Sequence, residues 1–589
     1  FYAFYLSTMF SAIAKFAVPL MGIETIAGMD LKYVLVPGLA LIVILYGVLG
    51  GLTAAYYTDL IQGLFIILLS VLLIPFGLLA LVKNFGDPET MGVMDGFRIL
   101  HERVSSDYFS LFAGPSAGEF PVQYIVSLSI LAMVGIVVQP HFIATGGGSA
   151  KSEDEARIGL VVGNFLKRLC TVGWALTALI ALALLANNAE IAIDPDRVWG
   201  VAAREILGPL NLGLVGLMLA CLMAAMMSSA DAYMLVTSAL VTRNVYAAFI
   251  NPDASEKTYV LVGRITGMIT IVAAALVAIT MADVFGQFKR AVELPILFAA
   301  PFWLGMYWRR ANRTAVWLTI LFSLLAFFVL PFALPLASPA LRENQTFSAA
   351  THLVTKTTTR PATAADVAKH EAWLEVSAAA REQNNEALLK QLGPEPPTGA
   401  VGEDIEVVVV SGGRPIFWSD ALEAQGETQL ETVDEYTEGE THVLVQQRTG
   451  DFIGRGDFNL DFLLYPLLGF DLSTVSKATL ETLRLPPRVL TPFLVLIVLS
   501  LLTPRNSQQT LDRYYAKMKT VVDPDPEQDR IKLEASYANP QRFESLRLFP
   551  GTDWEMLRPR AKDIIGIAVS IVVCALIIGL LVLLAGIGG

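Results

Sequence analysis

Charged residues are scarce in this sequence. Asp, Glu, Lys and Arg make up 16% of its 589 residues, whereas soluble domains average about 25%. No basic run with interleaved aromatic residues occurs, which argues against a nucleic-acid partner. Because hydrophobic residues reach 54%, the composition indicates an integral membrane protein.

Cysteine is also scarce, and signatures of several enzyme classes are missing. Cys170, Cys221 and Cys574 lie in apolar segments without CxxC spacing, so neither a disulfide framework nor a zinc site is indicated. The sequence has no HExxH metalloprotease motif and no kinase signature. We therefore expect neither an enzyme nor a bound cofactor.

Long apolar runs dominate what is present. A helix needs about 20 apolar residues to cross a bilayer. Candidate spans lie near 1–27, 33–50, 53–82, 123–143, 159–187, 211–242, 259–283, 291–308, 314–337, 487–503 and 563–587. Strict alternation of apolar and polar residues is absent, so these spans are helices and not barrel strands. The sequence predicts an all-α, multi-pass protein of the cell membrane.

The basic loops predict the orientation of these spans. Arg309, Arg310 and Arg313 follow one span, and 504–562 is rich in Lys and Arg, which marks both as cytoplasmic. The chain then divides into a membrane core at 1–337, an extracytoplasmic insertion at 338–486, a membrane helix at 487–503, a cytoplasmic loop at 504–562 and a C-terminal membrane helix at 563–589.

The insertion has mixed local patterns. Residues Asp366 to Leu392 follow a helical pattern, and Ile405 to Val410 read as a strand. We expect a small α+β domain there. The alternative is a partly ordered acidic insertion without a function of its own, because long loops tolerate insertions at low thermodynamic cost.

Polar residues follow a glycine pair between two spans. Gly50-Gly51 permits a tight reversal, and Thr58, Asp59 and Gln62 enter the next helix. A carboxylate inside a membrane costs about 2.5 to 3.5 kcal/mol on insertion scales and normally faces a partner or a watery cavity. Asp59 is therefore a functional candidate, and the alternative is an interfacial carboxylate stabilised by a helix dipole.

A second polar group interrupts the span at 211–242. Ser228, Ser229 and Asp231 lie in mid-helix, and Ala225 lies one turn before the serines. Hydroxyl and carbonyl oxygens are ligands that hard cations prefer. The alternative is that small Ala and Ser residues only allow close helix packing.

A third feature, Gln139-Pro140-His141, lies late in the fourth span. Pro140 removes a helix hydrogen bond, and interrupted helices are where transporters bind their solutes. His141 could titrate, although a buried neutral histidine bonded to a carbonyl is the plainer interpretation.

Together these stretches resemble the sodium:solute symporter family over about 1–335. GGLTAAYYTDLIQ is similar to the signature of its fifth core helix, VQPHF to the sixth, and AAMMSSADAYMLVTSALVTRNVY to the eighth. The resemblance implies a five-plus-five inverted-repeat bundle and sodium-coupled import of a small organic solute by alternating access. Matched by motif order, the first span is the third core helix, so we expect about 100 further residues, with the earlier helices, before Phe1.

The resemblance also implies the ion sites. The sodium ligands of the family fall here on the Ala225 carbonyl and on the Ser228 and Ser229 hydroxyls. Asp59 and Asp231 fall on facing helices, where two carboxylates need a shared proton or a cation between them. They form a second cation site, a proton-carrying pair, or no pair at all if Asp231 points into a watery vestibule.

The solute remains open at this point. Relatives that carry proline have aromatic residues before the Gln-Pro-His element, where this chain has Ala132 and Ile136, which argues against proline. The expected partners are a small solute, sodium ions and lipid, with no nucleic acid and an undetermined oligomeric state. A non-transporting solute sensor built on the same bundle is the alternative function.

Overall fold

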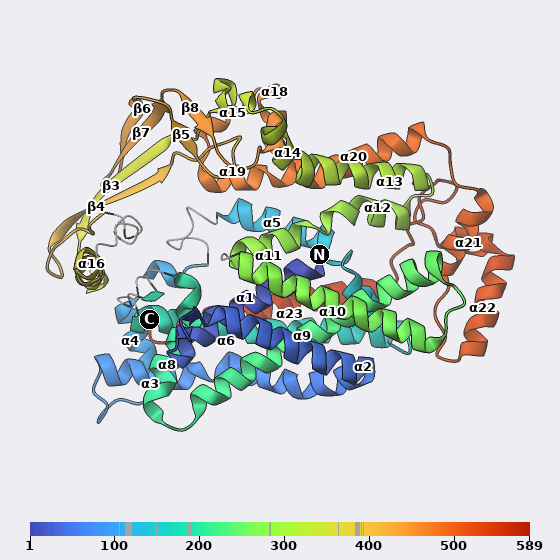
Figure 1. Ribbon diagram of the computed structural model, residues 1–589, viewed down its shortest axis with the longest axis horizontal. Coiled ribbons are helices and arrows are strands. Elements are labelled where there is room, and N and C mark those ends of the chain that lie inside the picture. The colour runs from blue at the N-terminus through green and yellow to red at the C-terminus, as the bar shows by residue number, and fades with distance from the viewer. Residues whose placement is uncertain are drawn as a thin grey trace.

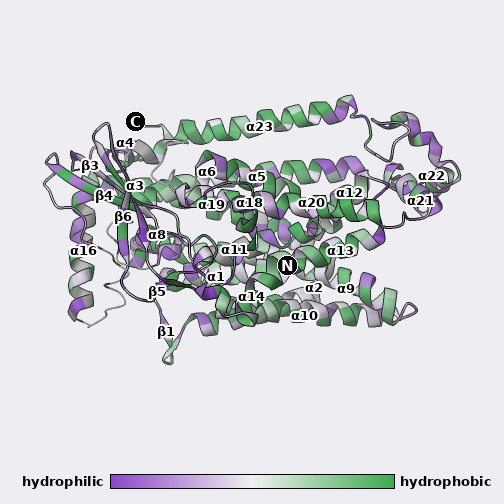
Figure 2. Ribbon diagram, turned by 90° about the horizontal axis from the view of Figure 1, so that it is seen from above, coloured by the Kyte–Doolittle hydropathy of each residue, from purple (hydrophilic) through white to green (hydrophobic). Residues whose placement is uncertain are grey.

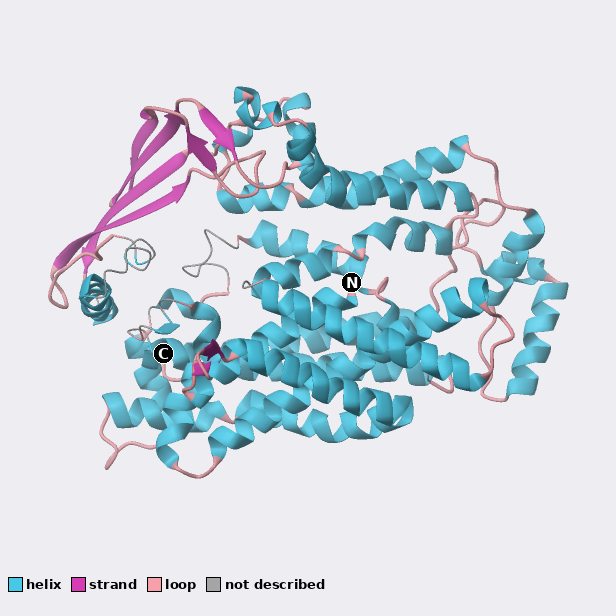
Figure 3. Cartoon of the chain, in the orientation of Figure 1, coloured by secondary structure: helices cyan, strands magenta, loops and turns pink. Residues whose placement is uncertain are grey.

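The computed structural model describes residues 1–104, 106–111, 121–148, 150–185, 188, 190–191, 194–281, 284–362, 364–382, 389, 392 and 394–589. These residues form an elongated bundle whose helices run mostly along the long axis (Figure 1), and the larger sheet lies at one end (Figure 3). Figure 2 shows hydrophobic residues along the bundle and hydrophilic residues gathered at both ends. The long axis is therefore the natural direction of the membrane normal.

The described residues contain eight helices that are long and apolar enough to cross a membrane. They are Tyr2–Met21, Tyr57–Phe85, Glu153–Leu185, Leu214–Ile250, Glu256–Thr280, Arg313–Ala337, Lys477–Leu502 and Ala561–Ala585. Three shorter apolar helices are Lys32–Gly47, Val122–Ile136 and Ala291–Tyr307. All of them overlap segments predicted from hydropathy, so the prediction of a helical multi-pass protein is confirmed.

The hydrogen-bonded elements divide the membrane part more finely. In chain order the helices are α1 (Tyr2–Met21), α2 (Lys32–Val71), α3 (Leu73–Phe85), α4 (Asp95–Arg103), α5 (Val122–Ile136), α6 (Glu153–Leu185), α8 (Val198–Leu207), α9 (Leu214–Val241), α10 (Glu256–Thr280), α11 (Val284–Glu293), α12 (Ile296–Tyr307), α13 (Arg313–Leu324), α14 (Leu330–Ala337), α20 (Leu485–Leu502) and α23 (Ala561–Ala585). The π-helical segments η6 (Thr242–Ile250) and η7 (Leu325–Val329) continue α9 and α13.

Helix α1 lies at the centre of the bundle. Its side chains Leu6, Phe10 and Ala17 are buried, and it packs against α2, α8, α9, α10 and α11. Gly200 of α8 faces the carbonyl oxygen of Phe16, where a Cβ atom would come within 2.2 Å of that oxygen. Only glycine allows this approach, and small residues serve the same purpose in many membrane helix pairs.

Helix α2 spans 40 residues, and its two described apolar parts, Lys32–Gly47 and the part from Tyr57 onward, are not collinear. The hydroxyls of Tyr46 and Thr58 are hydrogen-bonded to each other. In a straight helix two residues 12 positions apart lie about 18 Å apart along the axis, too far for these side chains to meet. These two parts of α2 therefore lie side by side and not end to end.

The insertion contains a larger sheet than the sequence predicts. Strands β3 (Leu353–Pro361), β4 (Asp404–Gly412), β6 (Gln429–Glu438) and β7 (Thr441–Thr449) form an antiparallel sheet in the order β4-β3-β7-β6, and β5 (Leu422–Ala424) pairs with β8 (Phe452–Gly454). The predicted strand at Ile405 to Val410 lies within β4, and the predicted helix begins as α16 (Ala364–Glu382), while part of its second half lies outside the described residues. Short helices α15 (Ala340–Glu343), α18 (Leu464–Leu467) and α19 (Lys477–Leu483) complete this region, whose apolar core surrounds Trp418.

A buried ion cluster joins the insertion to the membrane helices. Arg488 of α20 pairs with Glu293 at the end of α11 at 2.8 Å and with Asp461 of the insertion at 2.9 Å. The side chains of Arg488, Glu293 and Asp461 are at most 13% exposed. Arg484 adds a 2.6 Å hydrogen bond to Asn459 of the insertion. The insertion is thus fixed to the end of α11.

A second ion cluster lies at the opposite end of the bundle, around α21 (Gln508–Lys519) and α22 (Pro526–Ala538). The carboxylate of Glu555 is fully buried and pairs with Arg309, Lys519 and Arg547. Burial lowers the pKa of the Lys519 ammonium, and its bond to Glu555 opposes that shift. The cluster fastens the 504–562 segment to the end of α12.

The opposite positions of these two polar segments predict opposite labelling. Chains without native cysteines would carry Ser411→Cys in β4 or Gln509→Cys in α21, both at exposed positions. In oriented cells, an impermeant thiol reagent should label position 411 from outside, and position 509 only after the cells are opened. Labelling of both positions from the same side would contradict this arrangement.

The Arg488 cluster predicts a large loss of stability on its removal. Arg488→Met leaves the buried carboxylate of Glu293 without its cation and leaves Asp461 with only Arg484, at 3.6 Å. Loss of one partner of a buried ion pair costs about 3 to 5 kcal/mol in comparable cases. The matched control is Arg455→Met, which removes an exposed pair with Glu423 and should cost at most about 1 kcal/mol. Urea unfolding in detergent measures the free energy of unfolding of both variants. Equal losses would show that the buried cluster contributes no more to stability than the exposed pair.

Candidate ion and solute sites

Helices α2 and α9 bring the polar residues of two sequence motifs together. They pack closely against each other, and Asp59 of α2 lies against the Ser228 hydroxyl of α9. Asp231, one turn further along α9, lies close to Tyr46 and Asp59 of α2. The two carboxylates singled out from the sequence are therefore neighbours.

Asp231 is buried, and Asp59 beside it is partly buried. Asp231 is 1% exposed, and neither of its carboxylate oxygens accepts a hydrogen bond of good geometry from any residue the structure describes, although the Tyr46 hydroxyl lies within reach. The same holds for Oδ1 of Asp59 and Oε1 of Gln62. Two such carboxylates cannot both stay charged at low dielectric without a cation between them. The third hypothesis, which points Asp231 into a watery vestibule, does not fit this burial.

The expected sodium ligands lie on α9. The Ser229 hydroxyl is 3.4 Å from the Ala225 carbonyl oxygen, to which it donates a long hydrogen bond. Ser228 instead turns toward Asp59. One hydroxyl therefore lies beside the carboxylates, and the other lies beside a backbone carbonyl one turn away.

The Gln-Pro-His element interrupts its helix as expected. Helix α5 ends at Ile136, and the π-helical turn η3 (Phe142–Gly147) follows. Between them, the backbone amides of Val138 and Gln139 donate to carbonyls only three residues back, and Pro140 has no amide hydrogen to donate. Gln139 is buried, 7% exposed.

His141 lies in a group of aromatic rings that sequence reasoning did not predict. Its ring is 5.0 Å from Tyr233 of α9 and 6.1 Å from Tyr2 of α1, measured between centroids. Tyr5 of α1 continues the group to Tyr233 at 5.3 Å and to Phe288 of α11 at 6.3 Å. The aromatic group thus joins α1, α9 and α11 around the interrupted helix.

The aromatic group and the carboxylate pair are adjacent but distinct. Asp231 and Tyr233 are two residues apart on α9, and such residues point about 200° apart around a helix. Asp231 faces α2, whereas Tyr233 faces α1 and His141. The only sequence signal for the aromatic group was the recurrence of Tyr2 and Tyr5 three positions apart on α1.

Comparisons with known proteins agree with these features. The model of the sodium:solute symporter family matches residues 2–321, so the chain belongs to the sodium:solute symporter family. The members of this family are membrane transporters and not enzymes. The chain is a multi-pass protein of the cell membrane.

Individual relatives are distant. The osmoregulated proline transporter OpuE of Bacillus subtilis (strain 168) is 28% identical over 281 residues, 46% of this chain and 52% of that protein. The sodium/glucose cotransporter of Vibrio parahaemolyticus is 25% identical over 352 residues, 54% of this chain and 60% of that protein. The chain thus spans about half the length of these relatives.

One solved structure is similar in part. It shows a sodium-coupled sialic acid symporter in a substrate-bound outward-open state, with a TM-score of 0.40 and 18% identity over 55% of this chain and 68% of the other. At this distance the similarity adds nothing to the description of either site.

The unpartnered carboxylates predict a cation or proton effect on stability. A cation present at ten times its dissociation constant stabilises the folded state by about 1.4 kcal/mol. We expect Asp231→Asn to reduce either the stabilisation by NaCl over choline chloride or its dependence on pH. Thermal unfolding in detergent at several pH values measures both quantities.

The matched control for this experiment is Asp253→Asn in an exposed loop. It should leave both the sodium effect and the pH profile unchanged. If Asp231→Asn behaves like this control, the carboxylate pair neither binds a cation nor carries a proton.

Proposed function

We propose that this chain forms part of a sodium-coupled symporter that imports a small organic solute by alternating access. The observation that carries the proposal is the pair of neighbouring carboxylates in membrane helices, buried Asp231 and Asp59 beside Ser228, because the cost of such a pair is otherwise hard to explain there. Family membership and the many membrane helices support it. No observation favours the alternative of a non-transporting sensor.

The first sodium ion is assigned to the Ala225 carbonyl and the hydroxyls of Ser228 and Ser229. These are neutral oxygen ligands, which suit a hard monovalent cation. The 3.4 Å distance between the Ser229 hydroxyl and the Ala225 carbonyl supports a shared ligand position, because their bond is too long to hold the hydroxyl firmly.

Asp59 and Asp231 are assigned to a second coupling site. Sodium between the carboxylates would neutralise one charge, and a proton on either one would remove the repulsion. Tyr46 lies beside Asp231 and can donate to its carboxylate after a small movement. Sodium and proton remain two versions of this assignment, which the pH series above separates.

The solute is assigned to the interrupted helix at Gln139-Pro140-His141 and the aromatic group around it. The Gln139 side chain at the break, the His141 ring and the Tyr233 ring supply polar and flat apolar contacts together. Tyr2 and Phe288 bring α1 and α11 to the same region, which supports a site between two halves of the bundle. The five-plus-five inverted repeat is part of this proposal.

The topology follows the same scheme. The insertion at 338–486 lies outside the cell, and the 504–562 segment lies inside. The membrane helix at 487–503 connects these two segments, and the C-terminal membrane helix at 563–589 follows the inner one. Their positions at opposite ends of the bundle support this (Figure 1). Inward movement of sodium through 100 mV then supplies about 2.3 kcal/mol per ion for accumulating the solute.

Serine substitutions test the sodium assignment. We expect Ser228→Ala and Ser229→Ala each to raise the sodium concentration for half-maximal uptake about tenfold or more, because each removes one ligand oxygen. Uptake by proteoliposomes that contain the complete protein measures this, with Ser570→Ala as the matched control in the exposed C-terminal helix. Unchanged sodium dependence in both variants would show that the serines serve only packing.

A further inference from the structure

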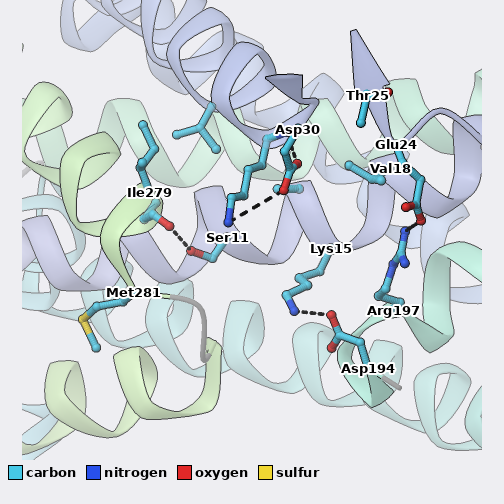
Figure 4. A pocket seen from close by; sticks show the side chains of 14 residues that line it. Ser11, Lys15, Val18, Glu24, Thr25, Asp30, Asp194, Arg197, Ile279 and Met281 are labelled. Atoms are coloured by element: carbon cyan, nitrogen blue, oxygen red, sulfur yellow. Dashed lines mark hydrogen bonds and ion pairs between the residues drawn. The ribbon is translucent and has the colours of Figure 1, made fainter. Parts of the chain in front are cut away.

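A charged pocket lies at the end of the bundle that carries the insertion. It has a volume of about 290 Å³ and lies between α1, the hairpin of β1 (Thr25–Ile26) and β2 (Met29–Asp30), the end of α10, and the turn η4 (Pro195–Arg197) (Figure 4). This volume suits a small organic solute. None of the residues assigned above to the ion or solute sites lines it.

The lining of this outer pocket carries equal numbers of positive and negative side chains. Lys15, Lys32 and Arg197 supply the positive charges, and Glu24, Asp30 and Asp194 supply the negative ones. Figure 4 shows Lys15 paired with Asp194, and Arg197 paired with Glu24, where Nη2 and Oε1 are 2.9 Å apart. Lys32 and Asp30 approach to 3.8 Å.

The Lys15–Asp194 pair joins elements far apart in the sequence across the pocket. The two side chains are 26% and 25% exposed, so water reaches both of them. Ion pairs with this much exposure contribute little to stability, and a ligand that replaces both partners can separate them at low cost. The pair is therefore exchangeable and does not hold the fold together.

The pocket lies above the proposed solute region along α1. Its floor is Ser11, whose hydroxyl is 2.9 Å from Nε2 of Gln287 on α11 and 3.5 Å from the carbonyl of Ala278. Tyr5, almost two turns earlier on α1, belongs to the aromatic group around His141. A solute entering from the insertion end would meet the pocket first and the Ser11–Gln287 contact next.

We propose that this pocket is an outer solute site that takes a small zwitterion, such as an α-amino acid or a betaine. A zwitterion can place its carboxylate against Lys15 and its cationic group against Asp194, so every wall charge keeps a partner. An anion would satisfy Lys15 and leave Asp194 unpaired, and a neutral polyol would gain nothing from separating the pair. The inference rests on the proposed function for the direction of transport, but binding itself does not require it.

The test is equilibrium binding to the full chain in lipid nanodiscs. Thermal stabilisation would be measured with glycine, L-alanine, L-serine and glycine betaine, with D-glucose and myo-inositol, and with acetate. The test variant carries both Lys15→Gln and Asp194→Asn, which removes the two charges together and leaves neither residue unpaired. The control variant carries Arg98→Gln and Glu102→Gln, which removes another exposed ion pair, in α4.

We expect at least one zwitterion to stabilise the unaltered chain while the polyols and acetate do not. The Lys15/Asp194 variant should unfold at nearly the same temperature without ligand and bind that zwitterion at least tenfold more weakly, whereas the Arg98/Glu102 variant should bind it normally. Equal binding by the test variant, or stabilisation by polyols in place of zwitterions, would overturn the proposal.

Uptake by the complete protein separates this inference from the proposed function. Zwitterion binding that depends on Lys15 and Asp194, without sodium-dependent uptake of any solute, would sink the symporter assignment and leave the outer site intact. Sodium-dependent uptake of a polyol that is unaffected by substitution of Lys15 and Asp194 would support the symporter assignment and contradict the outer site.

Discussion

The constraint on which the rest of this structure depends is the burial of Asp231 in a membrane helix. A carboxylate in that position must have a partner, and the polar side chains recorded beside it among the described residues are Tyr46 and Asp59 of α2. Tyr46 and Asp59 are 13 residues apart, which is about 20 Å along a straight helix. Both reach Asp231 because the two parts of α2 lie side by side, so this arrangement of α2 and the polar site on α9 depend on each other.

Hydropathy predicted the membrane spans well because the bilayer leaves little choice. Backbone groups in lipid must be bonded within a helix, and the length of an apolar run then fixes the span. The motif residues Asp59, Ser228 and Asp231 were also found, since polar residues stand out inside apolar runs. The structure adds that they meet, which depends on how α2 and α9 pack and cannot be read from either segment alone.

The contacts that the sequence concealed are of two kinds. Tyr2, Tyr5 and Tyr233 lie in apolar segments where an aromatic residue is as often packing as binding, so the spacing of Tyr2 and Tyr5 alone did not distinguish them. Strand β6 of the insertion was concealed for another reason, because each of its residues is exposed and its sequence lacks the alternation that marks a half-buried strand. In both cases tertiary pairing decided the outcome.

The helix pair α11 and α12 is held at two points, one directly beside the break between the helices and one at the far end of α12. Glu293 ties the end of α11 to Arg488, and Arg309 ties the end of α12 to buried Glu555. Between the two helices Pro295 supplies no amide hydrogen, so bending there breaks the fewest hydrogen bonds. Separating either ion cluster would expose a buried charge, which is far more costly. The structure therefore directs any bending of this pair to the Leu294–Pro295 break, next to the helix that carries Gln287 against Ser11.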